Sequence, residues 1–121
     1  MVRLMIFVPH LDDGPYAPEV GELYWIDTTI LDAYDKRPRR PGLVVEVPAD
    51  PNGRLTIVTR TTNIDRPGVY HDADPGLGLN RPGVFAYLRT AEAHLWTPEL
   101  VTYLDRVDAE LLAQVLEEFG L

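Results

Sequence analysis

Apolar residues alternate with polar ones, or form short β-branched runs, in several separate segments of the chain. These patterns predict strands at 21–27, 42–47, 55–61, 84–90 and 101–107. The apolar run at 4–8 is predicted to be a further strand or an arm. The eleven prolines and nine glycines fall almost entirely within the first ninety residues and divide them into short pieces. Such punctuation is typical of a small β-barrel.

One segment has a helical period instead. The stretch "DAELLAQVLEEFG" at 108–120 begins with Asp108 as a helix cap and ends at Gly120. Its apolar positions recur three or four residues apart and make one face: Leu111, Leu112, Val115, Leu116 and Phe119. The stretch "TPEL" at 97–100 predicts a single short turn of helix, with Thr97 as its cap and Pro98 at its first position.

The sequence "ADPNGR" at 49–54 is turn chemistry between two predicted strands, so 42–47 and 55–61 should pair as an antiparallel hairpin. Together the segments predict a mainly β fold, a small curled antiparallel barrel with a C-terminal helix packed on it. A length of 121 residues predicts a single domain over 1–121. Residues 1–20 are expected to be an N-terminal extension of this domain.

Cysteine is absent from the sequence, which excludes disulfides, zinc–thiolate sites and cysteine nucleophiles. A reducing cytosol is then the default, and we expect a cytoplasmic protein. The opening "MVRLMIFVPHLDD" is too short for a membrane span and has no small-residue cleavage site. No contact with a membrane is expected.

Charge is distributed unevenly along the chain. The formal net charge is −8, yet basic residues outnumber acidic ones in the central stretch 36–66. This stretch holds seven basic residues and three acidic ones (Glu46, Asp50 and Asp65). A local basic site can attract an anion despite a negative total. The basic residues of this central stretch are Lys36, Arg37, Arg39, Arg40, Arg54, Arg60 and Arg66.

The predicted hairpin brings three of the central residues together. Arg40 precedes one strand, and Thr61 and Thr62 end its antiparallel partner, so these ends should lie side by side. A guanidinium beside two hydroxyls is a good clamp for a phosphate, and at an RNA phosphodiester it would stabilise the charge of the transition state. The alternative is structural: Arg40 paired with Asp35, and threonines present for their strand propensity.

Other side chains carry weaker signals. The runs "HLDD" and "HDAD" have ligand-type residues at short spacing, but solvated turns account for them and we predict no metal site. His94 could act as an acid or base or be structural. Tyr24, Trp25 and Tyr87 could stack nucleic-acid bases or belong to the core.

Four segments in order give a family resemblance. "GELYWID" at 21–27, "RPGLVV" at 40–45, "TIVTRTTN" at 56–63 and the closing "DRVDAELLAQVLEEFGL" resemble the MazF/PemK family of toxin endoribonucleases over about residues 20–121. The resemblance implies an SH3-like small barrel of the MazF/PemK/CcdB type and a homodimer. It also implies metal-independent, sequence-selective cutting of single-stranded RNA to a 2′,3′-cyclic phosphate and a 5′-hydroxyl, with no cofactor. The expected partner is an antitoxin with an acidic disordered tail.

Carried over position by position, Arg40 matches the family's catalytic arginine and Thr61 its catalytic threonine, with Thr62 beside it. Asp35 falls where the family has a loop glutamate. Ala33 replaces a usual glycine, and Tyr87 stands where a polar base-reading residue is often found. The expected RNA-binding residues are Asp35, Arg37, Arg39, Arg60, Arg66 and Tyr87.

Two other functions fit the same barrel. The chain could be a catalytically inactive or gyrase-targeting toxin of the CcdB type, which grips a protein instead of cutting RNA. It could also be an unrelated barrel that binds a small anion.

Overall fold

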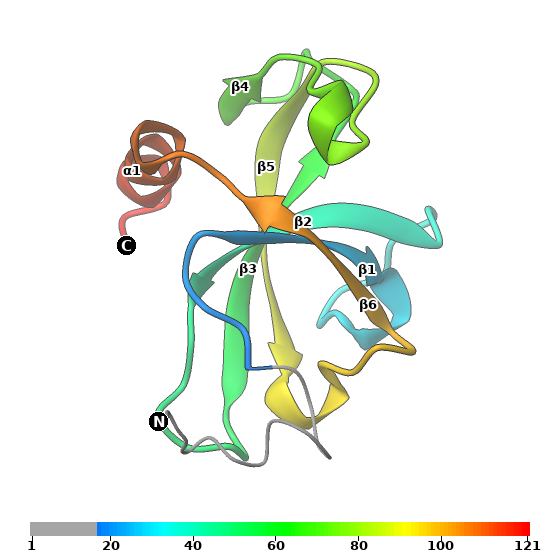
Figure 1. The fold of residues 1–121 in the computed structure, drawn as a ribbon, viewed down its shortest axis with the longest axis vertical. Helices are drawn as coiled ribbons and strands as arrows, with labels where there is room; N and C mark the ends of the chain where they lie inside the picture. The colour runs from blue at the N-terminus through cyan, green and yellow to red at the C-terminus, as the bar shows by residue number, and fades with distance from the viewer. Residues whose placement is uncertain (1–16) are drawn as a thin grey trace.

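The computed structural model describes residues 17–121, in which six antiparallel strands form one curled sheet in the order β4-β5-β3-β2-β1-β6 (Figure 1). The prediction of a mainly β fold with a C-terminal helix is confirmed. The strands are β1 (Glu22–Asp27), β2 (Arg39–Glu46), β3 (Arg54–Thr61), β4 (Val69–His71), β5 (Gly83–Glu92) and β6 (Val101–Arg106). The helices are α1 (Ala109–Glu118) and three single 3₁₀ turns, η2 (Thr28–Ile30), η3 (Pro75–Leu77) and η4 (Ala93–Leu95).

Alternating side chains of the sheet feed two separate hydrophobic clusters because successive residues of a strand point to opposite faces. Leu43 and Val45 of β2 belong to the first cluster, which α1 completes with Leu111 and Val115. Val44, between them, belongs to the second. The second cluster surrounds Trp96, which is fully buried, and contains Ile26 of β1. The sheet is therefore packed on both faces, which fixes the register of its strands.

The helix forms where its pattern predicted. The Asp108 carboxylate accepts a hydrogen bond from the Leu111 backbone N–H at 2.8 Å, which satisfies one of the free donors of the first turn. After the last turn, Gly120 has φ +70°, a left-handed conformation that suits glycine. Figure 1 shows α1 to one side of the sheet, and its contacts reach β4.

Three details differ from the sequence-based prediction. Strand β4 was not predicted, because three residues are too few for an alternating pattern to be visible. Strand β2 begins at Arg39, earlier than expected, because Arg39 still pairs with Asp27 of β1. The segment 97–100 is a hydrogen-bonded turn, and the short helix η4 precedes it at 93–95. The apolar run at 4–8 lies outside the described residues.

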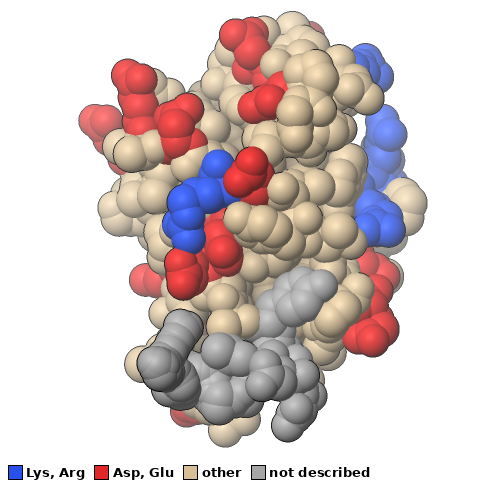
Figure 2. Space-filling view, in the orientation of Figure 1, with Lys and Arg blue, Asp and Glu red and all other residues tan. Residues whose placement is uncertain are grey.

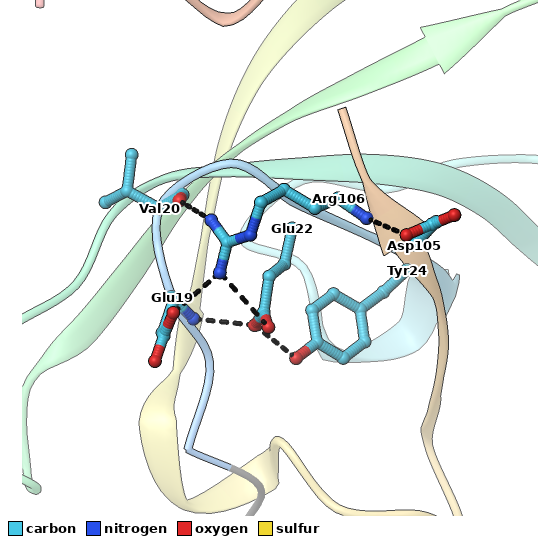
Figure 3. A network of polar contacts seen from close by, with 6 residues as sticks. All are labelled: Glu19, Val20, Glu22, Tyr24, Asp105 and Arg106. Atoms are coloured by element: carbon cyan, nitrogen blue, oxygen red, sulfur yellow. Dashed lines mark hydrogen bonds and ion pairs between the residues drawn. The ribbon is translucent and has the colours of Figure 1, made fainter. Parts of the chain in front are cut away.

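The first described residues are fastened to β6 by a polar network, which Figure 3 shows. The Arg106 guanidinium donates hydrogen bonds to the Glu19 carboxylate at 2.6 Å and to the Val20 carbonyl at 2.9 Å. The Glu22 carboxylate accepts from the Tyr24 hydroxyl at 2.8 Å. Burial, and then this carboxylate, raise the pKa of Tyr24 well above its ordinary value, so the hydroxyl stays protonated.

In the described part of the chain, no helix combines the length and apolar character needed to cross a membrane.

Candidate functional site

The start of β2 and the end of β3 lie next to each other, as the hairpin predicted. The two strands are antiparallel, with Gly42 opposite Thr59 and Leu43 opposite Val58. The same register, continued by two residues, leads to Arg40 on one strand and Thr61 on the other. The residues that the sequence singled out thus come to one end of the sheet.

A pocket of about 260 Å³ opens at this end. Five arginines and one threonine contribute to its lining, and within the described part of the chain no acidic residue does. Such a pocket attracts anions, because guanidinium groups offer several N–H donors in a fixed plane. The lining residues are Trp25, Arg37, Arg39, Arg40, Pro41, Arg60, Thr62, Gly78, Leu79, Asn80 and Arg81.

Asp35 holds the Arg40 guanidinium with two hydrogen bonds. Arg40 Nε donates to Asp35 Oδ2 at 2.8 Å, and Arg40 Nη2 donates to Oδ1 at 3.1 Å. Both side chains are mostly buried, at 14% and 13% exposure. Burial acts to raise the pKa of Asp35, but the hydrogen bonds from Arg40 and from the Arg37 N–H outweigh it and hold that pKa below its usual range. Two of the five N–H donors of Arg40 are used here, so within residues 17–121 three remain for a ligand.

The loop that carries Asp35 is tied to the sheet on both sides. Asp32 and Thr90 exchange two hydrogen bonds, one from each backbone N–H, at 3.0 Å. Further along, the Thr28 N–H donates to the Pro38 carbonyl at 3.0 Å. The Arg37 N–H closes a tight turn on the Asp35 carboxylate at 2.9 Å. These bonds fix the carboxylate that orients Arg40.

The two threonines have different environments. Thr62 is exposed and lines the pocket with Arg40. Thr61 is only 6% exposed, and its hydroxyl accepts a hydrogen bond from the Asn63 N–H at 3.1 Å. The sequence predicted that both hydroxyls would lie beside Arg40, but Thr61 is nearly buried and is not part of the pocket lining. Thr61 is the last residue of β3, and Thr62 lines the pocket.

Arg60 is almost completely buried, at 3% exposure. Its guanidinium donates to His71 Nδ1 at 3.1 Å and to the Arg81 carbonyl at 2.8 Å. It also donates to the carbonyls of His71 and Asp72, at 3.2 and 3.3 Å. Because these acceptors engage Nε and Nη2 of a buried side chain, we assign Arg60 to the support of the pocket.

The remaining predicted RNA-binding residues fall into two places. Arg37 and Arg39 are exposed and line the pocket with Arg40. Arg66 and Tyr87 lie outside its lining and contact each other, with the guanidinium carbon of Arg66 5.9 Å from the centre of the Tyr87 ring. The guanidinium of Arg89 lies 5.2 Å from the same ring.

Six of the lining residues were not predicted as site residues, and Arg81 and Trp25 are two of them. Arg81 lies between the predicted strands 55–61 and 84–90, where no sequence motif identified it. Trp25 was considered as a base-stacking residue, with the core as the alternative. It is partly exposed, and it both lines the pocket and packs against the first hydrophobic cluster.

One edge of the molecule gathers basic side chains. In Figure 2, Lys and Arg follow the right-hand edge, where β2 begins, and Asp and Glu cluster at the upper left over α1, while a further basic group left of the centre is surrounded by acidic ones. The net charge of the sequence is negative, yet one edge of the folded molecule is basic.

The candidate metal ligands do not assemble in the described part of the chain. Within residues 17–121, no three His, Asp or Glu side chains lie close enough to hold a metal ion. The run "HLDD" lies outside the described residues. His94 is exposed, and its Nδ1 lies 3.7 Å from Glu92 Oε1.

Comparison with known protein structures identifies the fold of this chain. A crystal structure of MazF from Deinococcus radiodurans superimposes with a TM-score of 0.63 and 23% identity, over 87% of this chain and 94% of that one. A MazE-MazF crystal structure from the same organism has a TM-score of 0.60 and 22% identity, over 87% and 93%. No protein-family model and no curated protein sequence matches the chain. The chain therefore has the MazF fold, as the resemblance implied.

Proposed function

We propose that this chain is the toxin of a toxin–antitoxin pair and cuts single-stranded RNA without a metal ion. The observation that carries the proposal is the pocket that Arg40 and Thr62 line together with further arginines, and no carboxylate of the described residues is in its lining. The MazF fold supports the same function.

In the proposed reaction, a phosphodiester of the RNA binds between Arg40 and Thr62. The free N–H groups of Arg40 and the Thr62 hydroxyl donate hydrogen bonds to the phosphoryl oxygens, where negative charge accumulates in the transition state. Asp35 keeps the guanidinium in place, so that little reorganisation accompanies the reaction.

The neighbouring 2′-hydroxyl attacks the phosphorus as the bond from phosphorus to the 5′ oxygen breaks. The proton of the 2′-hydroxyl passes to water. The 5′ oxygen takes a proton from Arg40, which recovers one from water. The products are a 2′,3′-cyclic phosphate and a 5′-hydroxyl.

The proposed protein partner is an antitoxin whose acidic disordered segment competes with RNA for the basic edge. Two arginines of this edge, Arg37 and Arg39, are exposed and available to carboxylates. Crystal structures that hold MazF together with MazE support a partner of this class. We further propose a homodimer that acts in the cytoplasm.

The experiment is to incubate the purified protein with a long single-stranded RNA in excess EDTA and to identify the new ends by mass spectrometry. We expect fragments that carry 2′,3′-cyclic phosphate and 5′-hydroxyl ends. Intact RNA together with inhibition of DNA gyrase would instead establish a toxin of the CcdB type, and intact RNA with no gyrase effect would leave a barrel that only binds.

A further inference from the structure

The pocket beside Arg40 has an apolar floor under its basic rim. Pro41 and Leu79 are buried, and Trp25 is partly exposed although it packs against the first hydrophobic cluster. In the ladder between β1 and β2, Trp25 stands opposite Pro41, so the two side chains share one face of the sheet. The floor is part of the folded core, which holds the exposed part of the indole in place.

Residues 78–81 also line the pocket, and Arg60 holds this loop in place. The Arg81 carbonyl accepts from the buried Arg60 guanidinium at 2.8 Å, and the same guanidinium bonds the Asp72 carbonyl at the other end of the loop. Arg81 itself is exposed and lines the pocket together with Arg39. Two cationic side chains from different elements thus border the Trp25 floor.

We propose that this part of the pocket is a subsite for one unpaired nucleotide of the RNA. Its base stacks on Trp25, and its phosphate binds Arg39 and Arg81. The inference rests on the proposed function and deepens it, because it assigns a binding place next to the phosphodiester held by Arg40 and Thr62.

The chemistry of the lining favours a nucleotide over simpler ligands. An inorganic anion would use the arginines and leave the indole face without a role. An apolar ligand would use the floor and gain nothing from the guanidinium groups. A nucleotide uses both, because every base has a π-face that stacks on an aromatic ring while its phosphate is anionic. The volume of about 260 Å³ lies just below the ~300–1,000 Å³ of typical small-molecule pockets, which suits a single nucleotide.

The two tryptophans allow a direct test. Trp96 is fully buried, so a ligand in the pocket should change the fluorescence of Trp25 alone. The probe is a short 2′-O-methyl oligonucleotide, which cannot be cut because its nucleophile is blocked. We expect it to quench the wild-type fluorescence and to have no such effect on Trp25→Phe. Uridine monophosphate should also quench, and inorganic phosphate should not.

Affinity is measured separately, by the fluorescence anisotropy of the labelled oligonucleotide. Trp25→Ala should weaken binding by roughly fivefold to a hundredfold, as expected for the loss of one stacked base. Tyr34→Ala is the matched control, because Tyr34 is 90% exposed and lies outside the pocket lining. If Trp25→Ala does not fold, the fluorescence response of Trp25→Phe and the affinity of Arg81→Ala still test the subsite.

Arg81→Ala should weaken binding at low salt and reduce the slope of log affinity against log salt by about 0.7, the value for one lost phosphate contact with a single strand. Arg54 is exposed at the far end of β3, so Arg54→Ala should leave the affinity and its salt dependence unchanged.

The results separate this subsite from the nuclease activity. RNA that is cut by a protein whose Trp25 signal does not respond to the bound oligonucleotide overturns the subsite and leaves the proposed function standing. Quenching by inorganic phosphate alone overturns base stacking. A protein that is quenched by the oligonucleotide but never cuts RNA keeps the subsite and loses the nuclease.

Discussion

The Asp35 carboxylate faces the Arg40 guanidinium edge to edge, with N–H···O distances of 2.8 and 3.1 Å. This pair joins the loop after η2 to the first residues of β2. It gives Arg40 one orientation, with its remaining donors free for a ligand. The proposed chemistry depends on that orientation.

Asp35→Asn tests the pair. The amide keeps the shape but loses the charge and one acceptor oxygen, so Arg40 should become less well oriented. We expect kcat for RNA cleavage to fall about tenfold or more with a smaller change in KM, because orientation matters most in the transition state. Asp50→Asn, in the turn between β2 and β3, is the control and should retain the wild-type rate. Equal rates for the two variants would contradict the role of Asp35.

The pair also has a predictable response to pH. The folded-state pKa of Asp35 is lowered, so the stability that the pair contributes is present above the unfolded value of about 3.9 and is lost as pH falls through the lower folded value. Between pH 8 and pH 5, titration of Asp35 should therefore cause no loss of cleavage. A rate that declines with a pKa near 6 and shifts in Asp35→Asn would contradict this assignment.

The two threonines should respond differently to removal of the hydroxyl. Thr62→Val should slow cleavage by about 10–1000-fold at unchanged stability, because it removes one donor to the phosphoryl oxygens. Thr61→Val should leave the rate per folded molecule close to that of the wild type and lower the free energy of unfolding by about 1 kcal/mol, because the Asn63 N–H loses its acceptor. Single-turnover kinetics and urea denaturation measure the two effects. If Thr61→Val slowed cleavage and Thr62→Val did not, the catalytic hydroxyl would belong to Thr61.

The Arg60 side chain should contribute to the free energy of unfolding. In Arg60→Met, the carbonyls of His71, Asp72 and Arg81 lose a buried donor, and we expect a loss of about 2–3 kcal/mol in the free energy of unfolding. Urea denaturation measures it, with Arg54→Met as the exposed control. A change below about 0.5 kcal/mol would mean that Arg60 does not hold the loop.

His71 should make stability depend on pH near neutrality. Burial and then the Arg60 charge lower its folded-state pKa, so the folded protein prefers neutral His71. The corresponding stability is complete above the unfolded value of about 6.5 and is lost as pH falls through the lower folded value. Unfolding midpoints measured from pH 7.5 to pH 5 should decrease, and the His71→Gln variant should lose this part of the dependence. An unchanged dependence in that variant would contradict the assignment.

Local patterns in the sequence were enough to locate most of the fold. Alternation identified β1, β3 and β6, and the cap and apolar face identified α1. The turn at 49–54 was enough to pair β2 with β3 and so to bring Arg40 near the end of β3. These features depend on residues that are close together in the chain, so they could be predicted from the sequence.

The parts that failed depend on long-range contacts. Strand β4 exists because β5 offers it an edge. Which of Thr61 and Thr62 faces the pocket could not be read from alternation alone, because the ladder between β3 and β5 is irregular at Thr59 and Arg60. Arg81 reaches the site only because Arg60 binds its carbonyl, and no local pattern records that contact.

The central claim is that Arg40 stabilises the transition state of RNA cleavage, and the most direct test is a single-turnover rate on one single-stranded RNA in EDTA. Arg40→Ala is compared with Arg54→Ala, which removes an exposed arginine outside the pocket, and circular dichroism verifies that both variants fold. The account predicts that Arg40→Ala cuts at least about 100-fold more slowly and that Arg54→Ala cuts at the wild-type rate. A folded Arg40→Ala variant that cuts RNA as fast as the wild type would contradict it.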